Sequence, residues 1–303
     1  MWDDEQLQAA FDQIPVLAGK REITELSGGL TNRNLKVVTA QGTYVARCNH
    51  HGSDLLGIDR DHEHHNSRAA EQAGVGAPVV DYRPDLAILV IGYIDGITYD
   101  NDSFQHPGVV ERAAHACRTL HTGPRFLGTF NMFVRQAGYL ATVLERGIKF
   151  PDDYRDHLDT FGDVERALAV NAKPPVPCNN DLLAGNFVDD GEKLWLIDYE
   201  YSGNNDACFE LGNIWSECAL TTDQLELLVT SYYGRTLRNK VARARLQGIV
   251  AKYGWTLWGC IQAATSPVDF DFWAWGMERY EAAVAEFRGP DLPRLLDDVQ
   301  RTD

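Results

Sequence analysis

Three polar residues in the second half of the chain have the types and spacing that phosphoryl transfer requires. Asp181 and Asn186 form the pattern D-x-x-x-x-N, and Asp198 follows twelve residues after the asparagine. The reaction needs a carboxylate that orients the attacking hydroxyl and accepts its proton, together with hard oxygen ligands for Mg²⁺. We therefore predict that Asp181 is the catalytic base and that Asn186 and Asp198 are metal ligands.

The elements around these residues would bring them together. Residues 186–189 and 193–198 each have the pattern of a short strand, and Asp190-Gly191 is a hairpin signal between them. Asp198 would then end an apolar strand that lies beside the loop of Asp181. The D-x-x-x-x-N pattern alone arises often by chance, whereas its combination with a hairpin is far more specific. The alternative is that the three residues only form turns and cap a strand.

Three nearby segments carry a longer pattern. They are NDLL at residues 180–183, LIDYEY at 196–201 and FELGN at 209–213. Together they resemble the choline/ethanolamine kinase family, part of the wider group of aminoglycoside-phosphotransferase-like kinases. The resemblance implies an α+β, two-lobed protein-kinase-like fold with a strand-rich N-lobe and a mainly helical C-lobe. It also implies ATP and Mg²⁺ as cofactors and a hydroxyl group as the phosphoryl acceptor.

One position departs from this family. The family usually has a histidine two residues before the catalytic aspartate, and this chain has Asn179 there. In kinase-like loops that histidine mainly supports the geometry of the loop, so we expect activity to survive its replacement. The departure leaves open a different possibility, a non-catalytic relative that only binds a nucleotide or another ligand.

A turn in the first third of the chain could cover the phosphates of a nucleotide. It contains Ser27, Gly28, Gly29 and Asn32, between two predicted strands. Glycines let the backbone approach phosphate oxygens, and the polar side chains can donate hydrogen bonds. The turn resembles the phosphate-covering loop of the family, although a Gly-Gly turn is also common in ordinary hairpins. The sequence contains neither the P-loop nor the Rossmann pattern.

Four further residues complete the predicted nucleotide site. Arg47, on the third predicted strand, would grip the α- and β-phosphates, as a basic residue does at this place in kinases. Glu63 on the following helix is its predicted partner, although either residue could instead be an ordinary charge on a strand or helix surface. Tyr93 and Ile94 lie in the predicted connector, where the family resemblance implies that adenine meets backbone groups.

Two tryptophans near the C-terminus are candidates for the acceptor pocket. Trp255 and Trp258 share one face of a predicted helix, and aromatic faces bind ammonium groups by cation–π attraction. In the family a tryptophan pair in a C-terminal helix lines the choline pocket, and Tyr201 matches another aromatic of that pocket. Glu200 and Glu217 would supply counter-charge. The alternative is that the tryptophans only pack helices together.

The composition favours an enzyme that acts on a small molecule. The 303 residues carry a net charge of −16, and 44% of them are hydrophobic. Such acidity repels nucleic acid and anionic membranes and tolerates a cationic substrate. The N-terminus lacks a secretory signal and the six cysteines show no paired spacing, so we expect a cytoplasmic protein. No pattern predicts the oligomeric state.

The predicted elements divide the chain into two lobes. Residues 1–96 are rich in strands and would bind the nucleotide, and residues 97–303 are mainly helical and would carry catalysis and the acceptor pocket. A crevice between unequal lobes is a common ligand site. The predicted function is ATP- and Mg²⁺-dependent phosphorylation of a small amino alcohol, choline or ethanolamine. The alternative acceptor is another hydroxylated cation, such as thiamine or an aminoglycoside.

Overall fold

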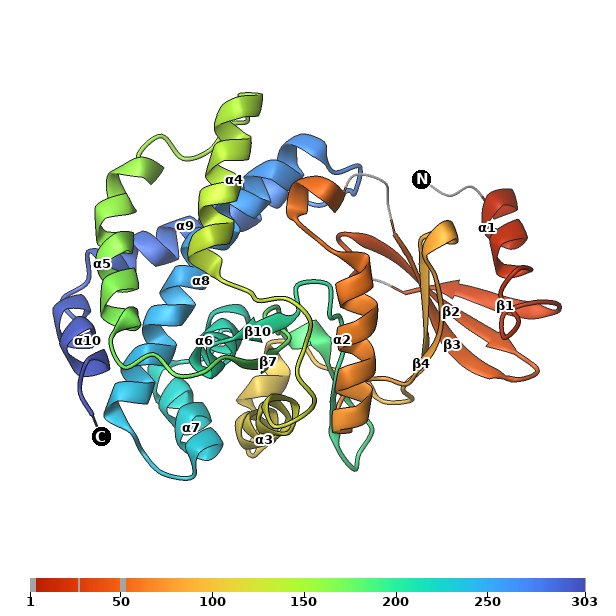
Figure 1. Cartoon of the computed structure of the whole chain (residues 1–303), viewed down its shortest axis with the longest axis horizontal. Coiled ribbons are helices and arrows are strands. Elements are labelled where there is room, and N and C mark those ends of the chain that lie inside the picture. Colours follow the sequence, from red (N-terminus) through yellow and green to blue (C-terminus); the bar gives the residue numbers. More distant parts are fainter. Residues whose placement is uncertain (1–3, 27, 50–52, 303) are drawn as a thin grey trace.

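An antiparallel five-stranded sheet occupies the first third of the chain (Figure 1). The computed structural model describes residues 4–26, 28–49 and 53–302. In spatial order the strands are β1 (Arg21–Glu25), β2 (Asn32–Thr39), β3 (Gly42–Asn49), β5 (Ile88–Gly92) and β4 (Val79–Arg83). The alternating residues Leu35 and Val37 of β2 are buried and pack with Phe11 of helix α1 (Asp4–Phe11).

Helix α2 (Arg60–Ala73) is inserted between β3 and β4, and it lies between the sheet and the helical part of the molecule (Figure 1). Its ends carry caps, the Asp59 side chain at the N-terminus and a left-handed Gly74 at the C-terminus. Ala70 packs into the larger hydrophobic core, which belongs mainly to the helical part. Because α2 contacts both parts, it holds the buried Glu63 between them.

Helices make up most of the remaining chain and surround a long central helix. In order they are α3 (Val109–His121), α4 (Met132–Arg146), α5 (Leu158–Ala169), α6 (Ala207–Glu217), α7 (Thr222–Tyr233), α8 (Arg238–Thr265), α9 (Phe272–Phe287) and α10 (Leu292–Val299). Helix α8 contacts α4, α6 and α9, and its middle is buried on all sides, as expected of a core helix. Gly212 of α6 and Gly248 of α8 permit a close crossing, since a Cβ on either would collide with the other helix.

Short strands form two small sheets beside the loop of Asp181. They are β7 (Val176–Cys178) with β10 (Gly203–Asn205), and β8 (Phe187–Asp189) with β9 (Leu194–Leu196) and β6 (Ile97–Thr98). The predicted hairpin of β8 and β9 is confirmed, and Asp190 N donates to Lys193 O at 3.3 Å where it closes. The sequence did not predict β6, β7 and β10, because two or three residues are too few for a periodic pattern.

The architecture is the α+β, two-lobed one that the sequence predicts. Figure 1 shows the sheet and α1 on one side and the bundle of helices on the other. The chain passes from β5 to β6 through residues 93–96. Within the described residues, no helix is long and apolar enough to cross a bilayer. The glycine turn, the residues that follow β5 and the loop between β7 and β8 all line one cavity.

Candidate active site

The loop that carries Asp181 is held from behind by a buried carboxylate. The backbone N–H groups of Asn179 and Asn180 donate to the two oxygens of Glu210 on α6, at 2.8 and 2.7 Å. Glu210 also lies within 4.8 Å of His121 and Cys178, a grouping that could suggest a metal site. Since both Glu210 oxygens already accept backbone N–H groups, we assign this cluster to support of the loop.

Asn179 ties the loop to the strand that carries Asp198. Its Oδ1 accepts a hydrogen bond from Asp181 N at 3.1 Å. Its Nδ2 donates to Ile197 O at 3.1 Å and to Asp198 O at 2.8 Å. The side chain is fully buried. The residue that departs from the family pattern therefore makes the contacts that keep the two acidic segments together.

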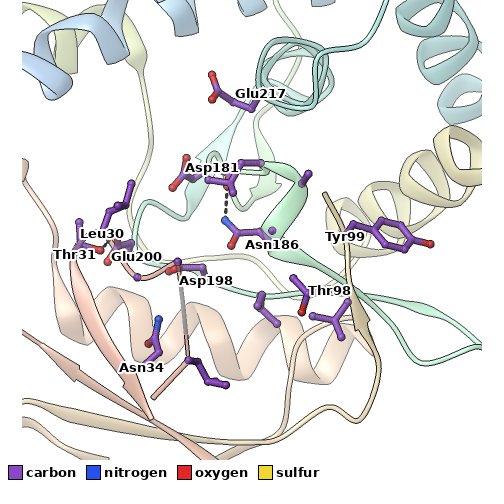
Figure 2. A pocket seen from close by; sticks show the side chains of 18 of the residues that line it. Leu30, Thr31, Asn34, Thr98, Tyr99, Asp181, Asn186, Asp198, Glu200 and Glu217 are labelled. Atoms are coloured by element: carbon purple, nitrogen blue, oxygen red, sulfur yellow. Dashed lines mark hydrogen bonds between the residues drawn. The ribbon is translucent and has the colours of Figure 1, made fainter. Parts of the chain in front are cut away.

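Asp181, Asn186 and Asp198 line the same cavity, as Figure 2 shows. Asn186 Nδ2 donates to the backbone oxygen of Asp181 at 2.7 Å, which leaves its Oδ1 as a possible ligand. Asp198 has a left-handed φ of 63°, a conformation uncommon outside glycine and better tolerated by aspartate than by most residues. The D-x-x-x-x-N pattern and the predicted hairpin placed these three residues in one site, and the structure brings them together.

The charge around Asp181 suits a divalent cation. Burial first, and then the carboxylates of Asp198, Glu200 and Glu217, raise the pKa of Asp181 well above its ordinary value, while Arg279 opposes the rise. Amide and carboxylate oxygens of Asn186 and Asp198 are the hard donors that Mg²⁺ prefers. The residues present therefore fit a magnesium ion, whose charge would offset this acidic field.

Arg47 of β3 bridges the two parts of the molecule at the cavity. Its guanidinium lies 3.1 Å from Glu63 Oε1, which is the predicted pairing, and it also donates to Asp198 Oδ1. Arg47 and Glu63 are almost fully buried. A buried guanidinium fixed by two carboxylates presents a positive charge in a defined place, as phosphate binding requires.

Residues of the glycine turn also line the cavity. Gly28 has φ of 95°, and a Cβ on Gly29 would collide with Asn32 O, so both positions require glycine. Ser27 lies outside the described residues. Asn32 differs from the prediction: its side chain is buried, Nδ2 donates to Glu200 Oε2 at 2.8 Å, and Oδ1 accepts from Arg60 at 2.9 Å. Its amide is therefore engaged within the protein, and Asn32 is not among the residues that line the cavity.

Two connector residues also line the cavity, as predicted for the adenine end. Tyr93 N donates to Thr43 O of β3 at 3.1 Å, so its own amide is used within the protein. The Lys36 ammonium lies 3.9 Å from the centre of the Tyr93 ring. Ile94 adds an apolar surface beside it. These residues provide a surface with both polar and apolar groups along the cavity.

Glu200 joins the two parts rather than standing free at the acceptor end. Its Oε1 accepts from Thr31 Oγ1 at 2.6 Å, and its Oε2 accepts from Asn32 at 2.8 Å and from Arg60 at 3.2 Å. All three donors come from the first third of the chain. Donors of the protein itself therefore satisfy the Glu200 carboxylate. The sequence analysis had expected this carboxylate to face an acceptor cation.

Aromatic side chains from two helices line the part of the cavity for which an acceptor was predicted. Trp255 and Trp258 of α8 both reach the cavity, and Trp258 Nε1 donates to Tyr201 Oη at 2.7 Å. The Tyr201 and Trp255 rings meet edge to face with centroids 5.1 Å apart. The Trp275 ring of α9 lies 5.1 Å from the Trp258 ring, centre to centre, and extends the same wall. Trp255 Nε1 donates to Asn213 Oδ1 of α6 at 3.2 Å, so hydrogen bonds fix both rings of α8.

Glu217, at the end of α6, is paired inside the protein. Its Oε2 accepts from Arg279 of α9, and its Oε1 accepts from Ser216 Oγ at 3.0 Å. The sequence analysis missed Arg279, although Trp275 and Arg279 are four residues apart and so share a helix face. Figure 2 shows Glu217 on the same side of the Asp181 loop as the Asp181 carboxylate. The lining residues, from the glycine turn to Arg279, border one open cavity of about 1150 Å³.

Proteins named as kinases are similar to this chain in sequence and fold. A choline/ethanolamine kinase family protein from Mesorhizobium loti has a solved structure with 32% identity and a TM-score of 0.86, and the match covers 98% of both chains. Protein LicA of Haemophilus influenzae is 25% identical over 73% of this chain and 65% of its own length. A probable ethanolamine kinase of Arabidopsis thaliana is 24% identical over 85% of this chain and 77% of its own. The sequence pattern of the phosphotransferase enzyme family (APH) matches residues 22–248, and the chain belongs to that family.

Proposed function

We propose that the protein is an ATP- and Mg²⁺-dependent kinase that phosphorylates the hydroxyl of a small amino alcohol, choline or ethanolamine. One observation carries the proposal. Asp181, the glycine turn with Arg47, and the aromatic residues Tyr201, Trp255 and Trp258 all line one cavity. The named relatives support the acceptor class, and a LicA structure of this fold in complex with AMP supports a nucleotide at the other end.

The residues would divide the reaction among them. Asp181 accepts the proton of the acceptor hydroxyl, whose oxygen attacks the γ-phosphorus of ATP. The bond from that phosphorus to the β–γ bridging oxygen breaks, so that the products are a phosphate monoester and ADP. Arg47, held by Glu63, orients the phosphates. Asn186 and Asp198 would hold Mg²⁺, which when bound neutralises charge on the phosphate oxygens.

The contacts of Asn179 argue against the alternative hypothesis that the protein is a non-catalytic relative. Its bonds to Asp181 N and to the backbone of Ile197 and Asp198 provide the support expected of the family histidine. The replacement thus gives no reason to expect a displaced Asp181. We expect catalysis, with the loop held by an amide instead of an imidazole.

The test is ADP release by the purified protein with ATP and Mg²⁺, in the presence of choline, ethanolamine, thiamine or an aminoglycoside. We expect turnover with choline or ethanolamine, and a loss of roughly 10²–10⁴-fold in kcat for Asp181→Asn, the range that a positioned general base contributes. ATP binding, measured by calorimetry, should remain in the variant. Unchanged turnover in Asp181→Asn would remove Asp181 from the mechanism, and turnover only with another acceptor would replace the amino alcohol.

A further inference from the structure

A second cavity lies where the first turns of α8 meet the loop before β7 and the C-terminal residues, which Figure 1 shows beside the start of α8. Its volume is about 240 Å³, and it shares no lining residue with the candidate active site. None of the described residues that line it carries a carboxylate, and five carry a positive charge: Lys173, Arg235, Lys240, Arg243 and Arg301. We call this cavity the basic pocket.

The charge of the basic pocket is opposite to that of the chain as a whole. The protein has 44 acidic and 28 basic residues, so a group of cations without a lining carboxylate runs against the composition. Like charges gathered around a small cavity repel one another, and this repulsion opposes folding unless an anion offsets it. A bound anion would therefore stabilise the folded protein.

Three of the five cations are available to a ligand. Lys173, Arg235 and Lys240 form no ion pair with a described residue, and the first two are exposed. Arg301 is partly neutralised, because its Nε lies 3.5 Å from Asp298 Oδ1. The positive charge of the basic pocket is thus not cancelled by the ion pairs that its lining residues make.

Arg243 gives the pocket a fixed donor. Its side chain is buried, and its Nε donates to Asp206 Oδ2. Its two Nη nitrogens have no hydrogen-bond partner among the described residues, so their N–H groups remain for a ligand. A guanidinium that a carboxylate holds on one side is preorganised for an anion on the other.

The start of α8 adds a second favourable group. The N-cap of this 28-residue helix is Leu237, which also lines the pocket and whose side chain makes no capping hydrogen bond. The helix dipole places partial positive charge at this end. Guanidinium, ammonium and helix dipole therefore act on the same cavity with the same sign.

The size and the donors of the pocket define the ligand. Its volume lies below the roughly 300–1,000 Å³ of sites for drug-sized ligands, so it suits a small anion. The cations come from three separate segments, the loop before β7, the α7–α8 region and the C-terminal residues. A phosphate group presents oxygens in several directions and carries up to two charges, whereas a carboxylate has two coplanar oxygens and one charge.

We infer that the basic pocket is an anion site, separate from the candidate active site, that binds the phosphate group of a small molecule. The ligand is inorganic phosphate or a small phosphate monoester, held by Arg243 and by the cations of Lys173, Arg235 and Lys240. This inference does not depend on the acceptor or on the reaction assigned to Asp181.

A ligand in the basic pocket would act on the element that holds the catalytic loop. Arg243 donates to Asp206, the N-cap of α6, whose Oδ1 accepts from Cys208 N at 2.9 Å. Helix α6 carries Glu210, which accepts the backbone N–H groups of Asn179 and Asn180. Binding should therefore slow amide hydrogen exchange at the start of α8 and at the start of α6, which locates the ligand directly.

Calorimetric titration with inorganic phosphate and with phosphoethanolamine, against chloride of equal ionic strength, tests the inference. We expect one saturable site with a Kd of about 1 mM or lower, and the anion with the lower Kd identifies the source of the phosphate group. Lys173→Met combined with Arg235→Met should raise that Kd at least about tenfold, because two charged contacts are lost. Both side chains are exposed, so the variant should unfold in chloride at the temperature of the wild type or above it.

Lys20→Met combined with Arg125→Met is the control, since these residues are exposed, line neither cavity and change the net charge equally. An equal loss of affinity in the control, or no saturable binding up to about 10 mM, would overturn the inference. Protection from exchange at residues 28–34 without protection at the start of α8 would place the anion in the candidate active site instead. Asp303 lies outside the described residues. A Kd at least tenfold lower after its removal would make the terminal carboxylates the occupant and would also overturn the inference.

Discussion

The side chain of Asn179 illustrates what residue types and spacing predict and what they leave out. The D-x-x-x-x-N pattern with its hairpin was enough to bring Asp181 and Asp198 into one site, because both parts of the pattern are local. The sequence could not reveal that Asn179 itself bonds to the backbone on either side of the site. It also could not reveal the hydrogen bond from Asn32 to Glu200, because the two residues are 168 positions apart in the sequence.

Replacing Asn179 by alanine removes three hydrogen bonds between the catalytic loop and the Asp198 segment. We expect kcat to fall by about one to two orders of magnitude through misplacement of Asp181, with a smaller change in the KM for ATP. The free energy of unfolding should fall by about 2 kcal/mol, since backbone groups lose their partners. Steady-state kinetics and urea unfolding measure the two effects.

Asn66→Ala provides the matched control for this prediction. Asn66 is also a fully buried asparagine, and its side chain bonds to Leu127 and Ser202, but it does not line the cavity. Its replacement should lower stability by a similar amount and leave kcat within about twofold. A comparable loss of kcat in both variants would mean that Asn179 acts through general stability alone.

At the scale of elements, the sequence predicted most helices and strands because their periodicity is local. The exceptions have identifiable causes. The strands β6, β7 and β10 have two or three residues each, and their pairing depends on distant partners. Trp255 and Trp258 were recognised on one helix face, yet only the packing of α9 on α8 brings Trp275 and Arg279 to them. Contacts between elements therefore define the acceptor wall.

The crossing of α6 and α8 gives the prediction at this scale. A Cβ at Gly212 would collide with Ala244 O and Gly248 N, both backbone atoms that cannot move aside independently. We expect Gly212→Ala to destabilise the protein by about 1–3 kcal/mol, as overpacking does, and to raise the KM for the acceptor by separating Glu217 from Trp255. Thermal unfolding and acceptor kinetics measure these effects.

Gly138→Ala serves as the control for the crossing. Gly138 lies within α4, where an added Cβ meets no atom within 4 Å. Alanine favours a helix over glycine by about 1 kcal/mol, so this variant should be neutral or more stable, with unchanged kinetics. If Gly212→Ala behaves like Gly138→Ala, the helices can separate at no cost and the close crossing does not hold the acceptor wall in place.

At the scale of the whole molecule, the sequence predicted two parts with different secondary structure but not the contacts that join them. Glu200 accepts hydrogen bonds from Thr31, Asn32 and Arg60, which lie 169, 168 and 140 residues away. Arg47 likewise reaches Asp198 across 151 residues. No local pattern encodes such distances. Asp198 and Glu200 both lie in the segment after β9. The contact between the two parts of the molecule therefore depends on the charges of these two carboxylates.

The burial of Glu200 between the two parts predicts that the stability of the protein depends on pH. Burial first, and then the Asp198 carboxylate, raise the pKa of Glu200 to about 7, while Arg60 opposes the rise. The ordinary value of a glutamate is 4.5. Because the folded protein then holds the proton more tightly than the unfolded chain, this group favours folding below about pH 4.5 and loses that contribution as the pH rises to about 7. The contribution amounts to about 3 kcal/mol at most.

Glu200→Gln removes this titration and keeps the size of the side chain. We expect the free energy of unfolding of the nucleotide-free wild type, relative to this variant, to decrease between about pH 5 and pH 7 and to stay constant above about pH 8. Urea unfolding across this range measures the difference. Glu25→Gln is the control, because Glu25 is exposed and pairs with Arg33 at the surface, and its profile should run parallel to that of the wild type. Parallel profiles for Glu200→Gln as well would show that Glu200 is ionised throughout, with Arg60 and Arg47 outweighing its burial.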